Sequence, residues 1–338
     1  MRNAAELEAK LAEPSEKLIH DLASVEGDIL ILGIGGKMGP SLGRLAVNTI
    51  RKGGLQKRVI GVSRFSDLQV KRELEESGME TISCDLLDDG ELQRLPDAKN
   101  VIYMAGHKFG TTGKEHFTWA MNAYLPGRVA DKYKDSRIVV FSSGNVYPFS
   151  AIKSGGASES VAPAPIGEYA QSCLGRERVF EYFSRLNDTP MVIFRLGYAI
   201  DMRYGVLLEL AKSVNEGKPI DVTMGHANVI WQGDANERAL RCLAKCSSPP
   251  SIVNVTGPET MSIRWAAEQF ARMMGKEAVF AGTEADAVLL NNATLSQQWF
   301  GYPRVSLLEL MEWTADWVLA GGHTWNKPTH FQERQGKY

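Results

Sequence analysis

Short apolar runs alternate with helix-length amphipathic segments from Asp28 to Arg195, and this alternation restricts the fold more than any other feature. The runs read DILILG, RVIGVS, TISC, NVIYMAG, RIVVFSS and MVIFRLG. Runs of this length, separated by helices, are typical of parallel strands that are buried under helices on both faces of a sheet. The pattern therefore predicts an α/β protein with a doubly wound parallel sheet over residues 28–195.

Residues 1–27 are predicted to form an N-terminal helical extension, because apolar residues recur there at helical spacing. After Arg195 the alternation loosens, which predicts a smaller substrate-binding domain over most of residues 196–322. Helices are expected at 206–214 and near Ile263, Ala293 and Leu307, with a strand pair inside PIDVTMGHANVIWQG. The polar tail, residues 323–338, has no usable period, and we expect it to wrap the surface or a neighbouring subunit.

The composition excludes several classes of protein. Lys plus Arg total 38 against 40 for Asp plus Glu, without runs of like charge, so we expect neither a nucleic-acid nor a membrane partner. Four cysteines lack framework spacing and six histidines lack metal-ligand spacing, which predicts a cytoplasmic protein without disulfides or a metal site. The first residues lack an apolar secretion segment, and no run of about 18 apolar residues occurs.

The segment ILGIGGKMGPSLGRLA places Gly33, Gly36 and Gly39 between an apolar strand and a helix. Glycines at this GxxGxxG spacing allow a tight turn, so that the helix N-terminus can direct amide hydrogens at a pyrophosphate. Because of this context, the turn predicts a dinucleotide site on a Rossmann-type sheet. Lys37 and Met38 lie inside the turn and are predicted to contact the cofactor, although Lys37 could equally be a solvated surface lysine.

The second strand ends in Ser63 and Arg64, where NAD-binding folds usually carry an acidic residue that accepts from a ribose hydroxyl. A carboxylate there would repel the additional phosphate of NADP, whereas serine can donate to it and arginine can pair with it. The sequence therefore favours NADP, with NAD as the alternative.

Together these motifs resemble the NAD-dependent epimerase/dehydratase family, the extended short-chain dehydrogenases, from Asp28 to about Gly322. The family's ordered motifs are matched by CDLLD, YMAG, SSGNVY, WQGDA and a helix asparagine at Asn122. The resemblance implies that Asp85 and Leu86 lie at the adenine and that Met104, Ala105 and Gly106 lie beneath the cofactor. It also implies a homodimer, which members of the family commonly form.

The resemblance further implies that Ser143 and Tyr169 form the catalytic centre. The family's YxxxK helix here reads YAQSC, so that Cys173 stands where the lysine is expected. That lysine lowers the tyrosine's pKa, and ionising a tyrosine of pKa about 10 at pH 7 costs about 4 kcal/mol. Lys108, Lys153 or Arg176 could supply the charge, although a surface position is favoured for Arg176, and Cys173 is favoured as a buried filler over a redox-sensitive thiol.

The substrate predicted from the sequence is smaller than the nucleotide sugars that many family members bind. Tyr198 and Ala227 stand where the family has an asparagine and a diphosphate-binding arginine, which favours a free sugar, sugar acid or polyol derivative. His107, Lys108 and Asn145 follow strand ends and are predicted to touch this substrate, with solvated loop residues as the alternative. We therefore expect an NAD(P)-dependent oxidoreductase, epimerase or dehydratase, or alternatively a weakly catalytic cofactor sensor.

Overall fold

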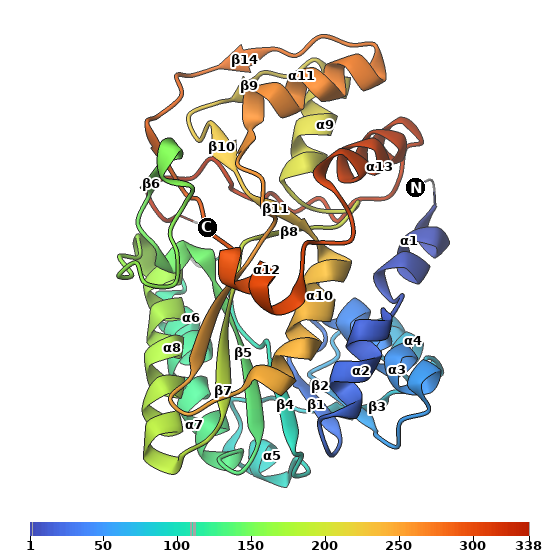
Figure 1. Ribbon diagram of the computed structural model, residues 1–338, viewed down its shortest axis with the longest axis vertical. Coiled ribbons are helices and arrows are strands. Elements are labelled where there is room, and N and C mark those ends of the chain that lie inside the picture. Colours follow the sequence, from blue (N-terminus) through green and yellow to red (C-terminus); the bar gives the residue numbers. More distant parts are fainter. Residues whose placement is uncertain (2, 109, 111–112, 338) are drawn as a thin grey trace.

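A central parallel sheet organises the molecule in the computed structural model, which describes residues 1, 3–108, 110 and 113–337 (Figure 1). Residues 2 and 338, in the predicted extension and tail, lie outside the described residues. The sheet has seven strands in the order β12-β7-β5-β4-β1-β2-β3, and every neighbouring pair is parallel. From edge to edge they are Ser251–Val255, Met191–Leu196, Arg137–Ser143, Asn100–Tyr103, Ile29–Leu32, Val59–Ser63 and Glu80–Ser83.

Helices cover both faces of this sheet, because successive strand residues are buried on opposite sides. Ile29 and Ile31 of β1 belong to the core under one set of helices, and Leu30 and Leu32 belong to the core under the other. The first set is α2 (Glu16–Ala23), α3 (Gly39–Gly53), α4 (Leu68–Glu76) and α10 (Gln232–Arg241). The second is α5 (Asp89–Arg94), α7 (Leu125–Lys132) and α8 (Gly167–Asn187). The predicted doubly wound α/β fold is confirmed.

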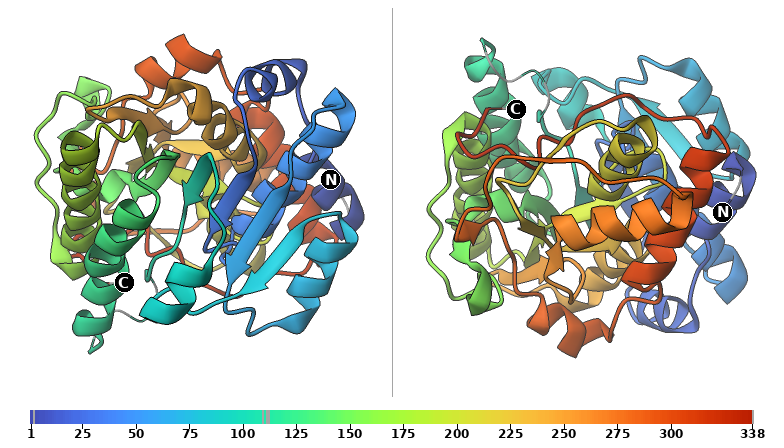
Figure 2. Two further views of the ribbon diagram at one scale, coloured as in Figure 1. Left: turned by 90° about the horizontal axis from the view of Figure 1, so that it is seen from below. Right: turned by 90° about the horizontal axis from the view of Figure 1, so that it is seen from above.

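A smaller C-terminal lobe lies beyond one end of the strands, at the top of Figure 1 and toward the viewer in the right panel of Figure 2. Its core joins three helices near the predicted positions, α9 (Val206–Glu216), α11 (Ile263–Met274) and α13 (Leu307–Leu319). Ser306 begins α13 with a capping box in which its side chain accepts from the Glu309 amide. The helix near Ala293, α12 (Thr294–Phe300), packs on β12 instead.

The predicted strand pair within residues 219–233 is wrong. That segment does contain β9 (Ile220–Asp221), β10 (His226–Ala227) and β11 (Val229–Trp231), but none of them pairs with another. Their partners come from elsewhere in the chain and are β14 (Phe280–Ala281), β13 (Met261–Ser262) and β8 (Tyr198–Ile200), respectively. Two-residue strands carry too little pattern to specify a partner from sequence.

The chain passes more than once between the central sheet and the C-terminal lobe. After residue 195 it enters the lobe, and then α10 and β12 return to the sheet. At the N-terminus α2 packs on α3, whereas α1 (Ala4–Leu11) buries Leu7 and Leu11 in the core of the lobe. The remaining short elements are α6 (Glu115–Trp119), η1 (Ala120–Tyr124), η2 (Gly144–Val146), η3 (Ile152–Ser154), η4 (Cys242–Lys245), β6 (Ser150–Ala151) and β15 (Ala287–Val288).

Candidate active site

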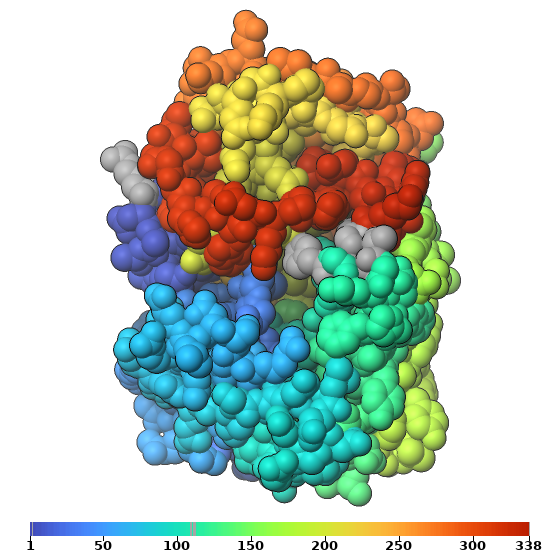
Figure 3. Space-filling model, turned by 180° about the vertical axis from the view of Figure 1, so that it is seen from behind, coloured from blue at the N-terminus to red at the C-terminus, as the bar shows by residue number. Residues whose placement is uncertain are grey.

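A cavity of about 240 Å³ lies at the carboxyl ends of the strands, where the sheet meets the lobe. Seen from behind, the surface is hollowed between the blue-to-teal half of the chain and the red C-terminal segment (Figure 3). The predicted site residues that line this cavity are Gly33, Gly36, Lys37, Met38, Met104, Lys108, Ser143, Asn145, Tyr169 and Tyr198. The structure thus brings ten residues from five separate segments to one space.

The glycine turn forms one wall of the cavity, and its glycines are required by close contacts. A Cβ added at Gly33, whose φ is 90°, would lie 2.6 Å from the Ala105 nitrogen, and one added at Gly39 would lie 2.0 Å from the Ile34 oxygen. Helix α3 begins here without a side-chain cap. A backbone turn packed too tightly for any Cβ, at the start of a 15-residue helix without a side-chain cap, fits the pyrophosphate of a dinucleotide.

The residues predicted for the adenosine half of the cofactor lie outside the cavity. Ser63 ends β2 beside the turn, since a Cβ added at Gly35 would lie 2.5 Å from its Oγ atom. Arg64 follows as an exposed residue. Asp85 and Leu86 follow β3, where the Asp85 carboxylate accepts from the Leu87 amide at 3.0 Å. These four residues lie at or just after the carboxyl ends of β2 and β3, the two strands that follow β1 toward one edge of the sheet.

The segment after β4 lies beneath the turn and contains both lining and supporting residues. Met104 lines the cavity, and Ala105 is buried against Gly33. Gly106 leaves room for Arg176, whose Nη2 would lie 2.6 Å from an added Cβ. His107 does not line the cavity, because its amide donates to Asn122 Oδ1 at 2.9 Å and its ring contacts Thr118.

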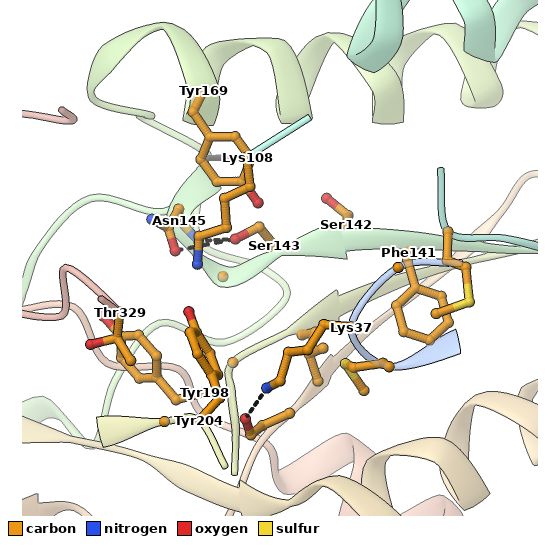
Figure 4. A pocket seen from close by; sticks show the side chains of 18 of the residues that line it. Lys37, Lys108, Phe141, Ser142, Ser143, Asn145, Tyr169, Tyr198, Tyr204 and Thr329 are labelled. Atoms are coloured by element: carbon orange, nitrogen blue, oxygen red, sulfur yellow. Dashed lines mark hydrogen bonds between the residues drawn. The ribbon is translucent and has the colours of Figure 1, made fainter. Parts of the chain in front are cut away.

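Ser143 and Tyr169 meet on the wall opposite the turn. Ser143 ends β5, and Tyr169 lies in the first turn of α8 (Figure 4). The Tyr169 hydroxyl lies close enough to Ser143 and Cys173 for both to affect its pKa, and Ser143 Oγ donates to Asn145 Oδ1 at 3.1 Å. Burial, followed by the Cys173 thiol, raises the pKa of Tyr169 well above its usual value, while Arg176 and Ser143 act in the opposite direction. Tyr169 is therefore a neutral acid at pH 7.

Cys173 lies behind Tyr169 rather than on the cavity wall. It is 1% exposed and packs in a cluster with Val146 and Tyr147. Burial raises the pKa of its thiol, so the group is uncharged at neutral pH and is a poor redox nucleophile. All four cysteines of the chain are free thiols.

The favoured surface position of Arg176 is wrong. Its side chain is buried, and the guanidinium donates to the Phe141 carbonyl and to Asn122 Oδ1, each at 2.7 Å. Asn122 lies in the π-helical turn η1, and its amide nitrogen also donates to the His107 carbonyl and to Ser172. Arg176 follows Cys173 by three residues on α8, so both side chains lie on the helix face that is turned toward the sheet. The prediction failed because the Phe141 carbonyl and Asn122 solvate the guanidinium there in place of water.

The side chains of Lys37 and Lys108 point toward the interior of the protein, which contradicts the alternative that they are solvated surface residues. Lys37 Nζ donates to the Ala199 carbonyl at 3.1 Å and lies 4.1 Å from the centre of the Tyr204 ring. Burial lowers the pKa of Lys37 to about 7, and Lys108 contributes in the same direction while Asp201 opposes it. Lys108 Nζ lies 5.9 Å from the centre of the Tyr169 ring. Lys153, which was also considered as a replacement for the missing lysine, is exposed in η3 and lies outside the cavity.

Several cavity residues were missed by the sequence analysis, and most of them come from the lobe and the tail. They include Phe141, Tyr204, Leu289, Asn291 and Thr329. The tail returns over the molecule's own surface, where Thr329 donates through its amide and its hydroxyl to the carboxylate of Glu209. No motif marks these positions, because their placement depends on the packing of distant segments. Only the polar character of the tail gave a signal that it covers a surface.

The described residues add two negative findings. No helix among them is long and apolar enough to cross a membrane. Within the same residues, no three His, Cys, Asp or Glu side chains come together in a way that could hold a metal ion.

A doubly wound sheet, a glycine turn and a Ser–Tyr pair on facing walls define a dinucleotide-binding protein of the short-chain dehydrogenase type. The model of the NAD dependent epimerase/dehydratase family matches residues 29–232, and the chain belongs to that family. No curated protein sequence matches the chain closely enough to count as a relative.

Solved structures share the fold over most of the chain. The UDP-glucose 4-epimerase of Thermotoga maritima is 17% identical, with a TM-score of 0.69 over 87% of this chain and 99% of that one. The Bacillus cereus UDP-glucuronic acid 4-epimerase, in complex with UDP-glucuronic acid and NAD, is 19% identical, with a TM-score of 0.69 over 86% and 99%. The Streptomyces venezuelae dTDP-glucose 4,6-dehydratase, with NAD bound, is 16% identical, with a TM-score of 0.73 over 86% and 97%.

Proposed function

We propose that the protein is an NAD(P)-dependent oxidoreductase, epimerase or dehydratase that acts on a small carbohydrate, with Tyr169 as its acid and base. One observation carries this proposal: Ser143 and Tyr169 line the same 240 Å³ cavity as the glycine turn. A hydroxylated carbon held between these walls would have a proton acceptor on one side and the cofactor on the other.

In this mechanism the chain's own residues move and hold the proton. When bound, the nicotinamide ring supplies a site that accepts or returns a hydride. Tyr169 takes the proton of the substrate hydroxyl as that carbon becomes a carbonyl, and returns it in the reverse direction. Ser143 donates a hydrogen bond to the same oxygen, which holds it at the tyrosine. A net redox change, an epimerisation and a dehydration all begin with this step.

Arg176 takes over part of the role of the missing lysine. It lies behind the tyrosine and lowers the pKa of Tyr169 from within the protein, without lining the cavity. Cys173 is neutral and cannot contribute charge. This neutral thiol is the observation that favours the second candidate, a cofactor-binding sensor that turns over slowly or not at all.

A substrate screen separates the two candidates. The purified protein is incubated with NAD or NADP and free sugars, sugar acids and polyols, and the absorbance of the reduced nicotinamide is followed. An epimerase returns the hydride and shows no net absorbance change, so product chromatography accompanies each reaction. We expect turnover of at least one compound. Tight calorimetric binding of cofactor without conversion of any compound would favour the sensor, and absence of cofactor binding would contradict both.

The cavity supports a substrate smaller than a nucleotide sugar. Tyr198 stands on its wall and fills the space where the family has a smaller asparagine. Ala227 is buried in β10 and carries no charge for a diphosphate. No arginine lines the cavity within the described part of the chain. A free sugar, sugar acid or polyol derivative fits this wall better than a diphosphate does.

NADP is the proposed cofactor, and Arg64→Ala tests it. We expect Arg64→Ala to raise the Kd of NADP by about 10- to 100-fold, the effect of losing a hydrogen bond to a charged group, and to leave the Kd of NAD nearly unchanged. Calorimetric titration of both cofactors measures this. Arg72→Ala, at an exposed position of α4, serves as the control. An equal increase in Kd for both cofactors would show that Arg64 does not bind the 2'-phosphate of NADP.

The raised pKa of Tyr169 predicts a different pH profile for each direction of the reaction. Oxidation needs the deprotonated tyrosine, so we expect log(kcat/KM) for oxidation to rise with pH between about 6 and 9. Reduction uses the neutral tyrosine as an acid and should stay flat over the same range. Because Arg176 lowers the pKa of Tyr169, Arg176→Met should slow oxidation at each pH, whereas Arg176→Lys should retain part of the rate. A flat oxidation profile would contradict the role of Tyr169.

A homodimer and a cytoplasmic location remain predictions. Exposed apolar side chains on the adjoining elements η1 and α8 support the first: Tyr124 is 60% exposed, Tyr182 61% and Leu186 59%. A second copy of the chain would cover this face.

A further inference from the structure

The cavity walls carry basic side chains and no acidic ones. Among the described residues that line the cavity, Lys37 and Lys108 are basic, and none is Asp or Glu. Burial lowers the pKa of both lysines; Lys108 also lowers that of Lys37, whereas Cys173 and Glu209 act against the shift of Lys108. Oxidised nicotinamide would add a further positive charge. A ligand with a negative charge would be stabilised in this space more than a neutral one.

The ammonium groups of Lys37 and Lys108 point in different directions. Lys37 ties the glycine turn to the lobe through the Ala199 carbonyl and the Tyr204 ring. Lys108 extends from the segment after β4, and its ammonium group points into the cavity toward Asn145 and Tyr198 (Figure 4). Of the two, Lys108 is therefore the cation placed to meet a substrate that also reaches Tyr169.

Asn291 adds an unsatisfied donor to the same space. It lines the cavity and is 6% exposed, and its Nδ2 atom has no hydrogen-bond partner within the described chain. The residue is held in place, since its backbone amide donates to Asn228 Oδ1 at 2.9 Å and its side chain packs on Gly144. A buried donor without an acceptor is costly, so Asn291 Nδ2 can pair with an acceptor that a ligand brings into the cavity.

We propose that the substrate is a sugar acid whose carboxylate is bound by Lys108 and Asn291 while its reacting hydroxyl lies at Tyr169 and Ser143. This inference rests on the function proposed above and narrows its substrate class. One ammonium and one amide supply donors for the two oxygens of a carboxylate, whereas a phosphate group presents three charged oxygens and favours arginine. Asn145 and Tyr198 border the same space and contact the sugar hydroxyls.

The test compares matched acids and neutral sugars. Glucuronate, galacturonate, gluconate and galactonate are assayed beside glucose, galactose and the corresponding hexitols, with glucose 6-phosphate as a second anion. We expect kcat/KM for at least one acid to exceed that of its neutral partner by about 10- to 100-fold, the effect of a charged hydrogen bond. Lys108→Met should remove this preference by raising KM for the acid, and Asn291→Leu should weaken it. Neither variant should change the Kd of the cofactor.

Controls distinguish the alternatives. Lys134→Met, at an exposed position away from the cavity, should retain the wild-type preference. Equal kcat/KM for acids and neutral sugars, or a preference for the phosphate, would overturn the inference. So would Lys108→Met lowering kcat equally for acids and neutral sugars, because Lys108 would then act on Tyr169 in place of the missing lysine.

Binding measurements keep this result separate from the proposed function. Calorimetry of each compound with the protein–cofactor complex requires no turnover. If acids bind more tightly than neutral sugars and Lys108→Met abolishes the difference, the acid site stands even where no compound is converted, and only the proposed enzymatic function fails. If compounds are converted but acids have no binding advantage, the function stands and the acid site fails.

Discussion

Replacing Tyr169 by phenylalanine is expected to lower kcat by about a thousandfold and to leave the Kd of the cofactor within about twofold of wild type. General acid–base catalysis by a positioned side chain contributes about 10²- to 10⁴-fold, and this variant removes only the hydroxyl that performs it. The ring itself packs with the cluster of Val146, Tyr147 and Cys173, so phenylalanine preserves the local structure. Steady-state kinetics on the substrate found by the screen, together with cofactor titration, measures both quantities.

A matched control lies on the same helix. Tyr182 is 61% exposed on α8, away from the cavity, and Tyr182→Phe should leave kcat and stability unchanged. Ser143→Ala should lower kcat by a smaller factor, because water can replace an orienting hydroxyl in part. A Tyr169→Phe protein that retains a tenth or more of the wild-type kcat would show that another group moves the proton.

The parts of the site that could be predicted from sequence are those fixed by local geometry. The turn at Gly33 to Gly39 depends on neighbouring backbone contacts, such as Gly39 against Ile34, and its residues are close in sequence. Ser143 and Tyr169 were predicted from the family resemblance alone, and the structure places both on the cavity wall. The sheet could also be predicted, because strands of four to seven residues carry a recognisable apolar pattern within one short segment.

What sequence could not supply depends on contacts between distant segments. Arg176 reads as a surface residue until Asn122 and the Phe141 carbonyl are seen to surround it. Asn291 and Thr329 reach the cavity only because the lobe and the tail fold back over the sheet. The pairing of β9, β10 and β11 failed for a related reason: two or three residues fit several partners, and the choice follows from tertiary packing.

Replacing Arg195 by methionine is expected to lower the free energy of unfolding by about 3–5 kcal/mol, because it leaves the buried carboxylate of Glu177 without its partner. Arg195 and Glu177 are each 2% exposed, and they form two hydrogen bonds of 2.9 and 2.6 Å. Arg195 also donates to the Tyr147 hydroxyl, and Ser142 donates to Glu177. The pair therefore joins β5, β7 and α8 directly beneath the strand end that presents Ser143.

The exposed pair Arg185–Glu181 on the same helix gives the control, with an Arg side chain that is 59% exposed. Arg185→Met should cost less than about 1 kcal/mol, since solvent screens such pairs. Urea unfolding of Arg195→Met, Glu177→Leu and the double variant forms a cycle. Because the double variant leaves neither charge unpaired, it should be more stable than the sum of the single effects predicts. Additive losses, or an Arg195→Met cost as small as the control's, would show that the pair does not hold α8 against the strands and that Ser143 is positioned by other contacts.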